Sequence, residues 1–281
     1  MLDLLKFAAP VALAALGETV GQKAGVLNIG LEGMMLAGAY AGMIATRQTG
    51  NPWVGVLCGV FAAVILGLIQ LFFVLKLQAD QVVAGTAINL LALGVTGASY
   101  RSVFGESGEL LSIPTITNHS LTAFMVLSVP VLWWLIYRTK WGLALRAVGE
   151  YPNAVEASGF QVIRIRLQAC LIGAFYAGLA GAHLSIINAA SFQEELTKGR
   201  GFIAIAMVTF GRFNPIWAFV ASLVIGGAEM LQYRLQAQGI QAPPQFFLAL
   251  PYVLALLVLV FVGKGGRSPQ ALAVPYRKEK G

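Results

Sequence analysis

The chain has 281 residues, of which 58% are hydrophobic and only 11% are charged, and its mean hydropathy is +0.76. Soluble globular domains usually contain about 25% charged residues, so this composition excludes an ordinary soluble protein and indicates a membrane protein. A net charge of +7 raises nucleic acid and anionic lipid as partners. Because the basic residues alternate between loops instead of clustering, we expect contact with membrane lipid and no nucleic acid.

Apolar runs of about 17 to 25 residues, long enough to cross a hydrocarbon core, recur along nearly the whole chain. The nine candidate segments cover residues 3–18, 26–46, 52–75, 82–100, 120–137, 166–188, 201–211, 215–234 and 246–263. The seventh is too short to span alone, which predicts a short or re-entrant segment. We therefore expect an all-α, polytopic membrane helix bundle with about eight or nine transmembrane segments. Residues 1–264 would form this domain, and residues 265–281 a cytoplasmic tail.

The first segment also has features of a signal peptide, since its short apolar core ends in alanines. Asp3 lies beside Lys6 there, without a clear positive cluster, which favours a membrane segment. Lys and Arg are kept on the cytoplasmic side of membrane proteins. If the loop at 139–166 is cytoplasmic, most basic residues share its side, so the pattern predicts a multi-pass protein of the cell membrane with a cytoplasmic carboxyl end.

The second segment has an unusual start, AGVLNIGLEGMMLAGAYAG at 24–42, in which Asn28 and Glu32 lie one helical turn apart among glycines. Ionisable groups in membrane helices are costly and usually face a cavity or a partner. The glycines also permit a broken or re-entrant helix, whose free backbone groups can line a solute site. The alternative is that Glu32 lies near the cytoplasmic interface and caps a neighbouring helix.

Three later helices carry sparse polar stripes, which suit an uncharged solute rich in hydroxyl groups. Hydrogen bonds between helices would explain the same residues. The stripes are Thr86, Asn89 and Thr96; Gln168, Tyr176 and His183; and Ser222, Glu229 and Tyr233. We expect the substrate pathway to include Asn28, Glu32, Thr86, Asn89, Tyr176 and Glu229.

The loop at 139–166 contains a predicted short helix. Pro152 suits the first turn of a helix, the NAVEAS run favours its continuation, and Gly159 suits its end. Such a helix could receive force from a soluble motor, or it could lie on anionic headgroups.

The stretch at 199–217 is interrupted by glycine and proline, and the start of the second segment is similarly interrupted by glycine. Paired interruptions of this kind indicate a central site in transporters built from two halves.

Several catalytic motifs are absent from the sequence. It contains no GxxxxGK[ST] phosphate loop, no HExxH and no GxSxG. Cys58 and Cys170 lie in apolar segments far apart, which favours packing roles over a disulfide or a metal site. We therefore expect no catalytic residue, metal ligand or cofactor in this chain, and an energy source in a partner or an ion gradient.

Five blocks of the chain resemble the permeases of ABC importers of the branched-chain amino acid, ribose and nucleoside group. They are GVLNIGLEGMMLAGA at 25–39, QVVAGTAINLLALG at 81–94, LRAVGEYPNAVEASG at 145–159, GRGFIAIAMVTFGRFNP at 199–215 and PPQFFLALPYVLALL at 243–257. The first and fourth look most like the nucleoside and simple-sugar branch. The resemblance implies a second homologous permease chain, a cytoplasmic ABC ATPase in two copies that binds ATP and Mg, and an extracytoplasmic solute-binding lipoprotein.

The resemblance also implies alternating access driven by the ATPase, with the motion entering through residues 150–159. Glu156, Ala157 and Gly159 would belong to the coupling helix, with Glu150 and Asn153 beside them, although the EASG here is shorter than the usual pattern. Alternatives to a nucleoside are ribose or another simple sugar and, less favoured, a branched-chain amino acid. An ion-coupled secondary transporter and an intramembrane enzyme are the rival classes.

Overall fold

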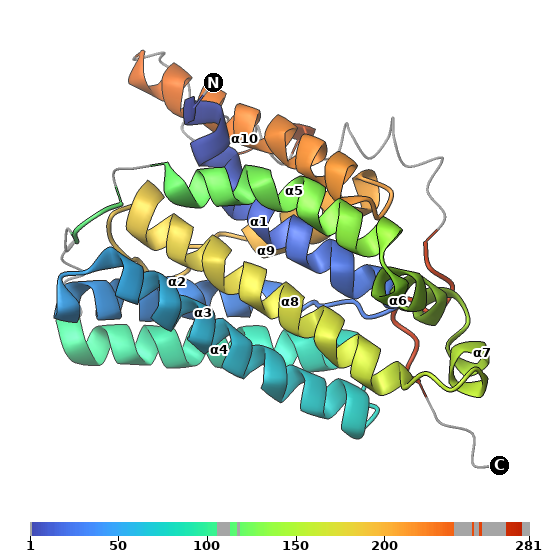
Figure 1. Ribbon diagram of the computed structural model, residues 1–281. Helices are drawn as coiled ribbons and strands as arrows, with labels where there is room; N and C mark the ends of the chain where they lie inside the picture. Colours follow the sequence, from blue (N-terminus) through green and yellow to red (C-terminus); the bar gives the residue numbers. More distant parts are fainter. Residues whose placement is uncertain are drawn as a thin grey trace.

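The computed structural model describes residues 2–105, 113–116, 119–238, 249, 253–254 and 268–276. These residues form helices and loops and contain no strand, which confirms the all-α expectation. The candidate segment at 246–263 lies almost entirely outside the described residues, and so does the block at 243–257. In chain order the helices are α1 (Leu2–Lys23), α2 (Leu31–Thr49), α3 (Pro52–Leu71) with the π-helical η1 (Phe72–Lys76), α4 (Gln81–Phe104), α5 (Ser120–Arg138), α6 (Lys140–Glu150), α7 (Pro152–Ala157), α8 (Val162–Ala182) with the π-helical η2 (His183–Asn188), α9 (Arg200–Phe210) and α10 (Pro215–Ala237) (Figure 1).

Six stretches of the described chain are long and apolar enough to cross a membrane. They are Leu2–Lys23, Pro52–Lys76, Gln81–Phe104, Ser120–Arg138, Val162–Asn188 and Pro215–Ala237. The shorter α9 has 11 residues, as expected for a partial segment, and α2 is a second helix outside the six. The structure thus supports a polytopic membrane bundle, and the predicted count of eight or nine segments only roughly.

The centre of the bundle is formed by α1 and α8, which are mostly buried, whereas less than half of α3, α4 and α10 is buried. Helix α1 packs against α8, α9 and α10, and α8 packs against α2 and α3. The exposed residues of the outer helices are large and apolar, such as Leu57, Phe61 and Leu90. Since lipid tails are as apolar as these side chains, such surfaces are typical of the wall that faces lipid.

Glycine pairs hold α2 and α3 together as an antiparallel hairpin. A Cβ added at Gly59 would come 2.6 Å from the carbonyl oxygen of Gly38, and one at Gly55 would meet the carbonyl oxygen of Gly42. Only glycine therefore permits the two backbones to approach this closely. Gly38 and Gly42, like Gly55 and Gly59, have the small-xxx-small spacing that is typical of close helix contacts in membranes.

The second halves of two helical hairpins begin in the same way. Asn51 accepts a hydrogen bond from the backbone N–H of Trp53, and Asn214 accepts one from that of Ile216, each at 3.0 Å. A proline follows each asparagine at the first helical position, where its missing N–H costs nothing. The pairs α2–α3 and α9–α10 are therefore joined alike, by an Asn-Pro turn at which the second helix starts.

The first helices of these two pairs, α2 and α9, both begin inside the bundle. Phe192 packs on Tyr40 and Tyr100 at one end of the molecule, whereas the Phe213 ring lies 5.9 Å from the Lys23 ammonium at the end that carries α6 and α7. The chain from 192 to 213 therefore traverses the bundle, first as a loop and then as α9. The seventh candidate segment is short, as predicted, and together with the loop before it runs from one end of the bundle to the other.

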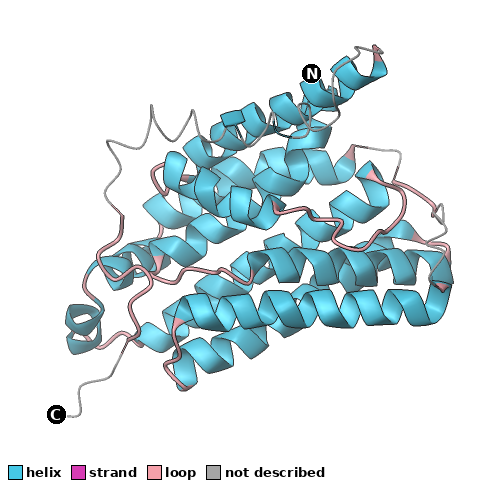
Figure 2. Ribbon diagram, turned by 180° about the vertical axis from the view of Figure 1, so that it is seen from behind, coloured by secondary structure: helices cyan, strands magenta, loops and turns pink. Residues whose placement is uncertain are grey.

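Residues 24–49 cross the bundle in the opposite direction, and they too do so first as a loop and then as a helix. Gly25 lies at the α6–α7 end, where its carbonyl accepts from Ala273, and Arg47 lies over the Phe104 ring at the opposite end. The stretch at 24–30 is largely buried and non-helical, and α2 completes the crossing. Figure 2 shows such loop stretches running among the helices. The helices α2, with 19 residues, and α9, with 11, thus start at neighbouring points in the interior and run to opposite ends. Because each follows a non-helical stretch within the bundle, we call them half-helices.

Candidate functional site

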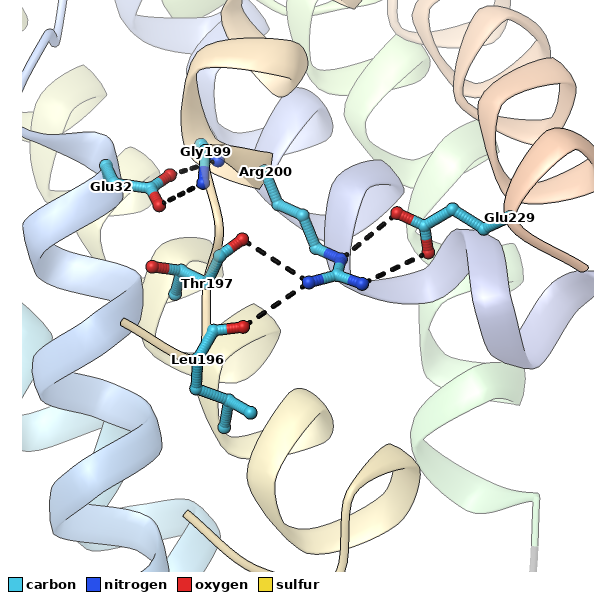
Figure 3. A network of polar contacts seen from close by, with 7 residues as sticks. Glu32, Leu196, Thr197, Gly199, Arg200 and Glu229 are labelled. Atoms are coloured by element: carbon cyan, nitrogen blue, oxygen red, sulfur yellow. Dashed lines mark hydrogen bonds and ion pairs between the residues drawn. The ribbon is translucent and has the colours of Figure 1, made fainter. Parts of the chain in front are cut away.

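The Glu32 carboxylate, in the first turn of α2, caps the start of α9 (Figure 3). Its Oε1 accepts the backbone N–H of Gly199 at 2.7 Å, and its Oε2 accepts that of Gly201 at 2.6 Å. The first N–H groups of a helix have no partner within it and carry the positive end of its dipole, so a carboxylate is well suited there. The prediction that Glu32 caps a neighbouring helix is confirmed, but its predicted place near the cytoplasmic interface is not, since it lies inside the bundle.

Glycine is required where the two half-helices meet. A Cβ at Gly201 would lie 2.7 Å from the backbone nitrogen and Cα of Glu32. Gly199 has a φ of +78°, a conformation that L-residues other than glycine rarely adopt. The GRG sequence at 199–201 therefore lets the start of α9 lie directly against α2.

Arg200, between these glycines, extends to the other side and pairs with Glu229 of α10 (Figure 3). Its Nε lies 3.1 Å from Oε1 of Glu229 and its Nη2 lies 3.4 Å from Oε2. Nη1 donates to the carbonyl oxygens of Leu196 and Thr197. The two side chains are only 14% and 8% exposed, so a charge left alone here would be costly.

The buried linker at 24–30 is held by polar side chains from other helices. Backbone groups without helical partners must be satisfied internally at such depth. Glu18 accepts from the N–H of Asn28, Gln81 accepts from that of Leu27, and Asn89 donates to the carbonyl of Ile29 while accepting from the N–H of Gly33, at distances of 2.8 to 3.1 Å. These side chains, of which Asn89 was predicted to line the pathway, therefore support the non-helical backbone.

A cavity of about 460 Å³ lies beside the Arg200–Glu229 pair. Its lining comes from α1, η2, the loop after η2, α9 and α10. The residues are Phe7, Leu184, Asn188, Ala189, Ser191, Gln193, Leu196, Lys198, Arg200, Glu229 and Tyr233. The rings of Phe7 and Tyr233 stack with their centroids 5.2 Å apart. The buried Oδ1 of Asn188 has no hydrogen-bond partner among the described residues. The cavity thus combines an aromatic wall with amides, a hydroxyl and an ion pair.

The predicted pathway residues do not all lie together. Glu229 lines the cavity, and Glu32 lies behind it on the other side of α9, whereas Asn28 and Asn89 belong to the linker network. Thr86 is exposed on α4 and donates to the carbonyl of Val82. Tyr176 is buried in the core between Phe124 and Phe175.

Sequence reasoning missed Asn188, Ser191 and Gln193 as lining residues. They lie in a π-helical turn and the loop after it, where the projection of a regular helix does not apply. A usable signal was the polar cluster NAASFQEE at 188–195, directly after an apolar segment. Tyr233, by contrast, shares with Glu229 the stripe read from α10.

The α6–α7 end carries a second, apolar groove. The short helix α7 begins with Pro152 and is followed by Gly159 at a φ of +86°, as predicted. The groove measures about 650 Å³ and is lined by Lys140, Leu143, Ala144, Ala147, Glu150, Tyr151, Ala154, Val155, Ser158 and Phe160. The predicted coupling residues lie on or near it: Glu150, Asn153, Ala157 and Gly159 are exposed and Glu156 is half-buried. Large apolar side chains exposed beyond the membrane bundle are typical of a docking surface.

Within the described residues, no group of three or more His, Cys, Asp and Glu side chains lies close enough together to hold a metal ion. Cys58 and Cys170 are free thiols. The expectation that the chain binds no cofactor of its own stays a prediction.

The chain is similar to known transport proteins over nearly its whole length. Residues 1–262 match the family described as the permease component of branched-chain amino acid transport systems. The guanosine ABC transporter permease protein NupQ of Bacillus subtilis is 32% identical over 98% of this chain and 95% of its own length. The nucleoside ABC transporter permease protein NupC of Lactococcus lactis is 30% identical over 99% and 96%. TsgC13 of Haloferax volcanii, provisionally named a glucose ABC transporter permease protein, is 35% identical over 84% and 78%.

Proposed function

The chain belongs to the permease family of branched-chain amino acid transport systems and is a multi-pass ABC transporter permease, and we propose that the solute it carries is a nucleoside. The ATPase of such a transporter is a separate subunit, so the permease performs no chemistry on the solute. Its task is to offer a polar pathway through the membrane and to change which side that pathway opens to.

The observation that carries the proposal is the cavity beside Arg200 and Glu229. A nucleobase has two flat faces and an edge of donors and acceptors, and its sugar carries hydroxyl groups. Stacking of a base on an aromatic ring is worth about 1–3 kcal/mol, and Phe7 and Tyr233 offer such rings. Asn188, with its unpartnered amide oxygen, can accept from a base or a hydroxyl. The relatives named for guanosine and nucleosides, which align over almost all of this chain, support the same assignment.

In this proposal Glu229 belongs to the solute site and holds Arg200 in place at its floor. Glu32, Glu18 and Asn89 are the scaffold behind it, because they hold the start of α9 and the backbone before α2, to which Asn28 belongs. Thr86 and Tyr176 lie away from the cavity and contribute to the pathway only through packing. The cavity is one half of a site that the second permease subunit completes.

The α6–α7 groove is proposed as the docking site of the cytoplasmic ATPase, which binds the ATP and Mg. Coupling would pass through Glu150, Asn153, Glu156, Ala157 and Gly159. The proposal assigns the carboxyl end to the cytoplasm, and the basic residues Lys23, Arg146 and Arg212 at the α6–α7 end support it. An extracytoplasmic binding lipoprotein would deliver solute to the opposite end.

A simple sugar is the second candidate. The similarity to TsgC13 favours it, and the amide and hydroxyl groups of the cavity would serve a sugar as well as a ribose. The aromatic pair is the feature that separates the two, since a sugar lacks the flat base that would stack on such a ring.

The test is uptake into proteoliposomes that contain this chain with its co-purified partners and ATP on the ATPase side. Radiolabelled guanosine, glucose, ribose and leucine are compared, each with and without ATP. ATP-dependent uptake of guanosine above the other three supports the proposal. Preference for glucose or ribose would move the assignment to a sugar, and uptake driven by an ion gradient without ATP would contradict the ABC mechanism.

A further inference from the structure

Residues 268–276 lie against the α6–α7 end of the bundle as a strap. The backbone N–H of Ala271 donates to the carbonyl of Gly149 at 2.9 Å, and that of Ala273 donates to the carbonyl of Gly25 at 3.2 Å. The N–H of Gln270 lies 3.4 Å from Oε2 of Glu150. The strap, defined as residues 268–276, therefore bonds both to the end of α6 and to the buried linker at 24–30.

Arg166 fastens the strap to the linker from within. Its side chain is 1% exposed, its Nε donates to the carbonyl of Ala24 at 3.1 Å, and its Nη1 donates to that of Val274 at 3.3 Å. The guanidinium also lies over the Tyr276 ring, 5.8 Å from the centroid. Tyr276 is 8% exposed. A guanidinium has donors in a fixed fork, so one side chain can hold two backbone segments in a defined relation.

The same three elements also meet directly. A Cβ at Gly149 would overlap the carbonyl of Lys23 and come 3.4 Å from the nitrogen of Gly25, while one at Gly25 would come 2.9 Å from the carbonyl of Ala271. The end of α6, the start of the linker and the strap are thus in backbone contact, without side chains between them that could absorb a displacement. A shift of α6 must move the linker or break these bonds.

The linker leads to α2, whose Glu32 holds the start of α9 beside the cavity. We propose that the strap, with Arg166 and Tyr276 as positioning residues, links movement of α6 and α7 to the linker at 24–30 and so to the two half-helices. This inference rests on the proposed function, because it supposes that an ATPase moves α6 and α7. It predicts that loosening the strap lowers the amount of solute moved per ATP hydrolysed, while ATP hydrolysis continues.

The test uses the full complex in proteoliposomes and measures solute uptake and ATP hydrolysis in the same preparation. Tyr276→Ala removes the ring over Arg166, and Tyr276→Phe is its matched control, since the hydroxyl has no hydrogen-bond partner among the described residues. We expect Tyr276→Ala to lower uptake per ATP by about threefold or more with hydrolysis kept, and Tyr276→Phe to behave as wild type. Arg166→Lys, which keeps the charge and loses the fork, should shift the ratio in the same direction.

An unchanged ratio of uptake to hydrolysis in Tyr276→Ala would overturn the inference, as would a parallel fall of both quantities, which a merely stabilising role predicts. If the Arg166→Lys variant does not assemble into the complex, the comparison of Tyr276→Ala with Tyr276→Phe still tests the inference. A wild-type complex without ATP-dependent uptake would refute the proposed function itself, whereas an active wild type with normal coupling in Tyr276→Ala refutes only the role of the strap.

Discussion

The Glu32 carboxylate accepts the backbone N–H of Gly199 at 2.7 Å, across 167 positions of the chain. This contact joins the starts of two half-helices that run to opposite ends of the bundle. In transporters, interrupted helices are tolerated where they line a cavity, because their free backbone groups find partners there. The position of this contact beside the cavity explains why a carboxylate is retained in so apolar a chain.

Replacement of Glu32 should weaken the contact between α2 and the start of α9, and two variants should do so to different degrees. Glu32→Gln keeps one carbonyl oxygen but turns an NH₂ group toward the other N–H, whereas Glu32→Ala removes both acceptors. Hydrogen bonds to charged groups contribute about 1.5–3 kcal/mol, so we expect Ala to lower the melting temperature of the purified complex more than Gln. Uptake should fall in the same order. Thr86→Ala, on the exposed face of α4, is the control and should change neither quantity.

The Arg200–Glu229 pair should show the behaviour of a buried ion pair. Removing one partner leaves a buried charge alone, which typically costs about 3–5 kcal/mol, whereas removing both leaves none. We therefore expect Arg200→Met and Glu229→Met each to destabilise the complex more than the double variant does. Thermal melting measures this, and single variants as stable as the double would contradict it. Uptake should be lost in all three because the floor of the cavity is gone.

Local features of this fold could be predicted from the sequence, but the contact between Glu32 and the start of α9 could not. Asn51-Pro52 and Asn214-Pro215 are helix starts that local rules predict, and Pro152 with Gly159 marks α7. The partner of Glu32 could not be predicted, because nothing local specifies a contact with Gly199. Asn188 was not predicted as a lining residue because a π-helical turn alters the direction of side chains. Asn89 was predicted to line the pathway because the projection of a helix does not distinguish a side chain that faces a cavity from one that bonds to a neighbouring backbone.

Gly201→Ala should separate the half-helices. The added methyl group would lie 2.7 Å from backbone atoms of Glu32, and overpacking of this kind costs about 1–3 kcal/mol. Because alanine is otherwise the better helix former, by about 1 kcal/mol, a loss of stability and uptake can be assigned to the overlap. Gly94→Ala, where nothing lies within 4 Å of the new Cβ, is the matched control and should be neutral or stabilising.

Tyr233 should affect solute binding more than stability, since it lines the cavity and is 48% exposed. Loss of a stacking ring worth about 1–3 kcal/mol corresponds to a change in affinity of about five- to 150-fold. We expect Tyr233→Ala to raise the KM for guanosine uptake by a factor in this range, and Tyr233→Phe to raise it little. Trp217→Ala, on an exposed part of the same helix away from the cavity, serves as control. Equal KM values for the Ala variants at 217 and 233 would contradict the stacking role.

The contribution of the Arg101–Glu194 ion pair to stability should depend on pH. Both Nε and Nη2 of Arg101 donate to the carboxylate at 2.7 Å, and this hydrogen bonding lowers the pKa of Glu194. A lowered pKa in the folded state stabilises the fold at pH values above the unfolded pKa, and this contribution is lost as the pH falls through the folded pKa. The melting temperatures of wild type and Glu194→Gln should therefore differ at neutral pH and converge in acid. The difference is small because the pair is exposed, and a gap that widens in acid would contradict the assignment.

Protection of a cysteine in the cavity is the most direct test of the central claim, that a nucleoside binds beside Arg200 and Glu229. Gln193→Cys and Thr49→Cys would each be made in a background with Cys58 and Cys170 replaced, and labelled with a membrane-impermeant maleimide in the assembled complex. We predict that saturating guanosine slows labelling of the Gln193→Cys variant several-fold and leaves the Thr49→Cys variant unchanged. Equal labelling of the Gln193→Cys variant with and without guanosine, in a complex that still takes guanosine up, would place the solute elsewhere.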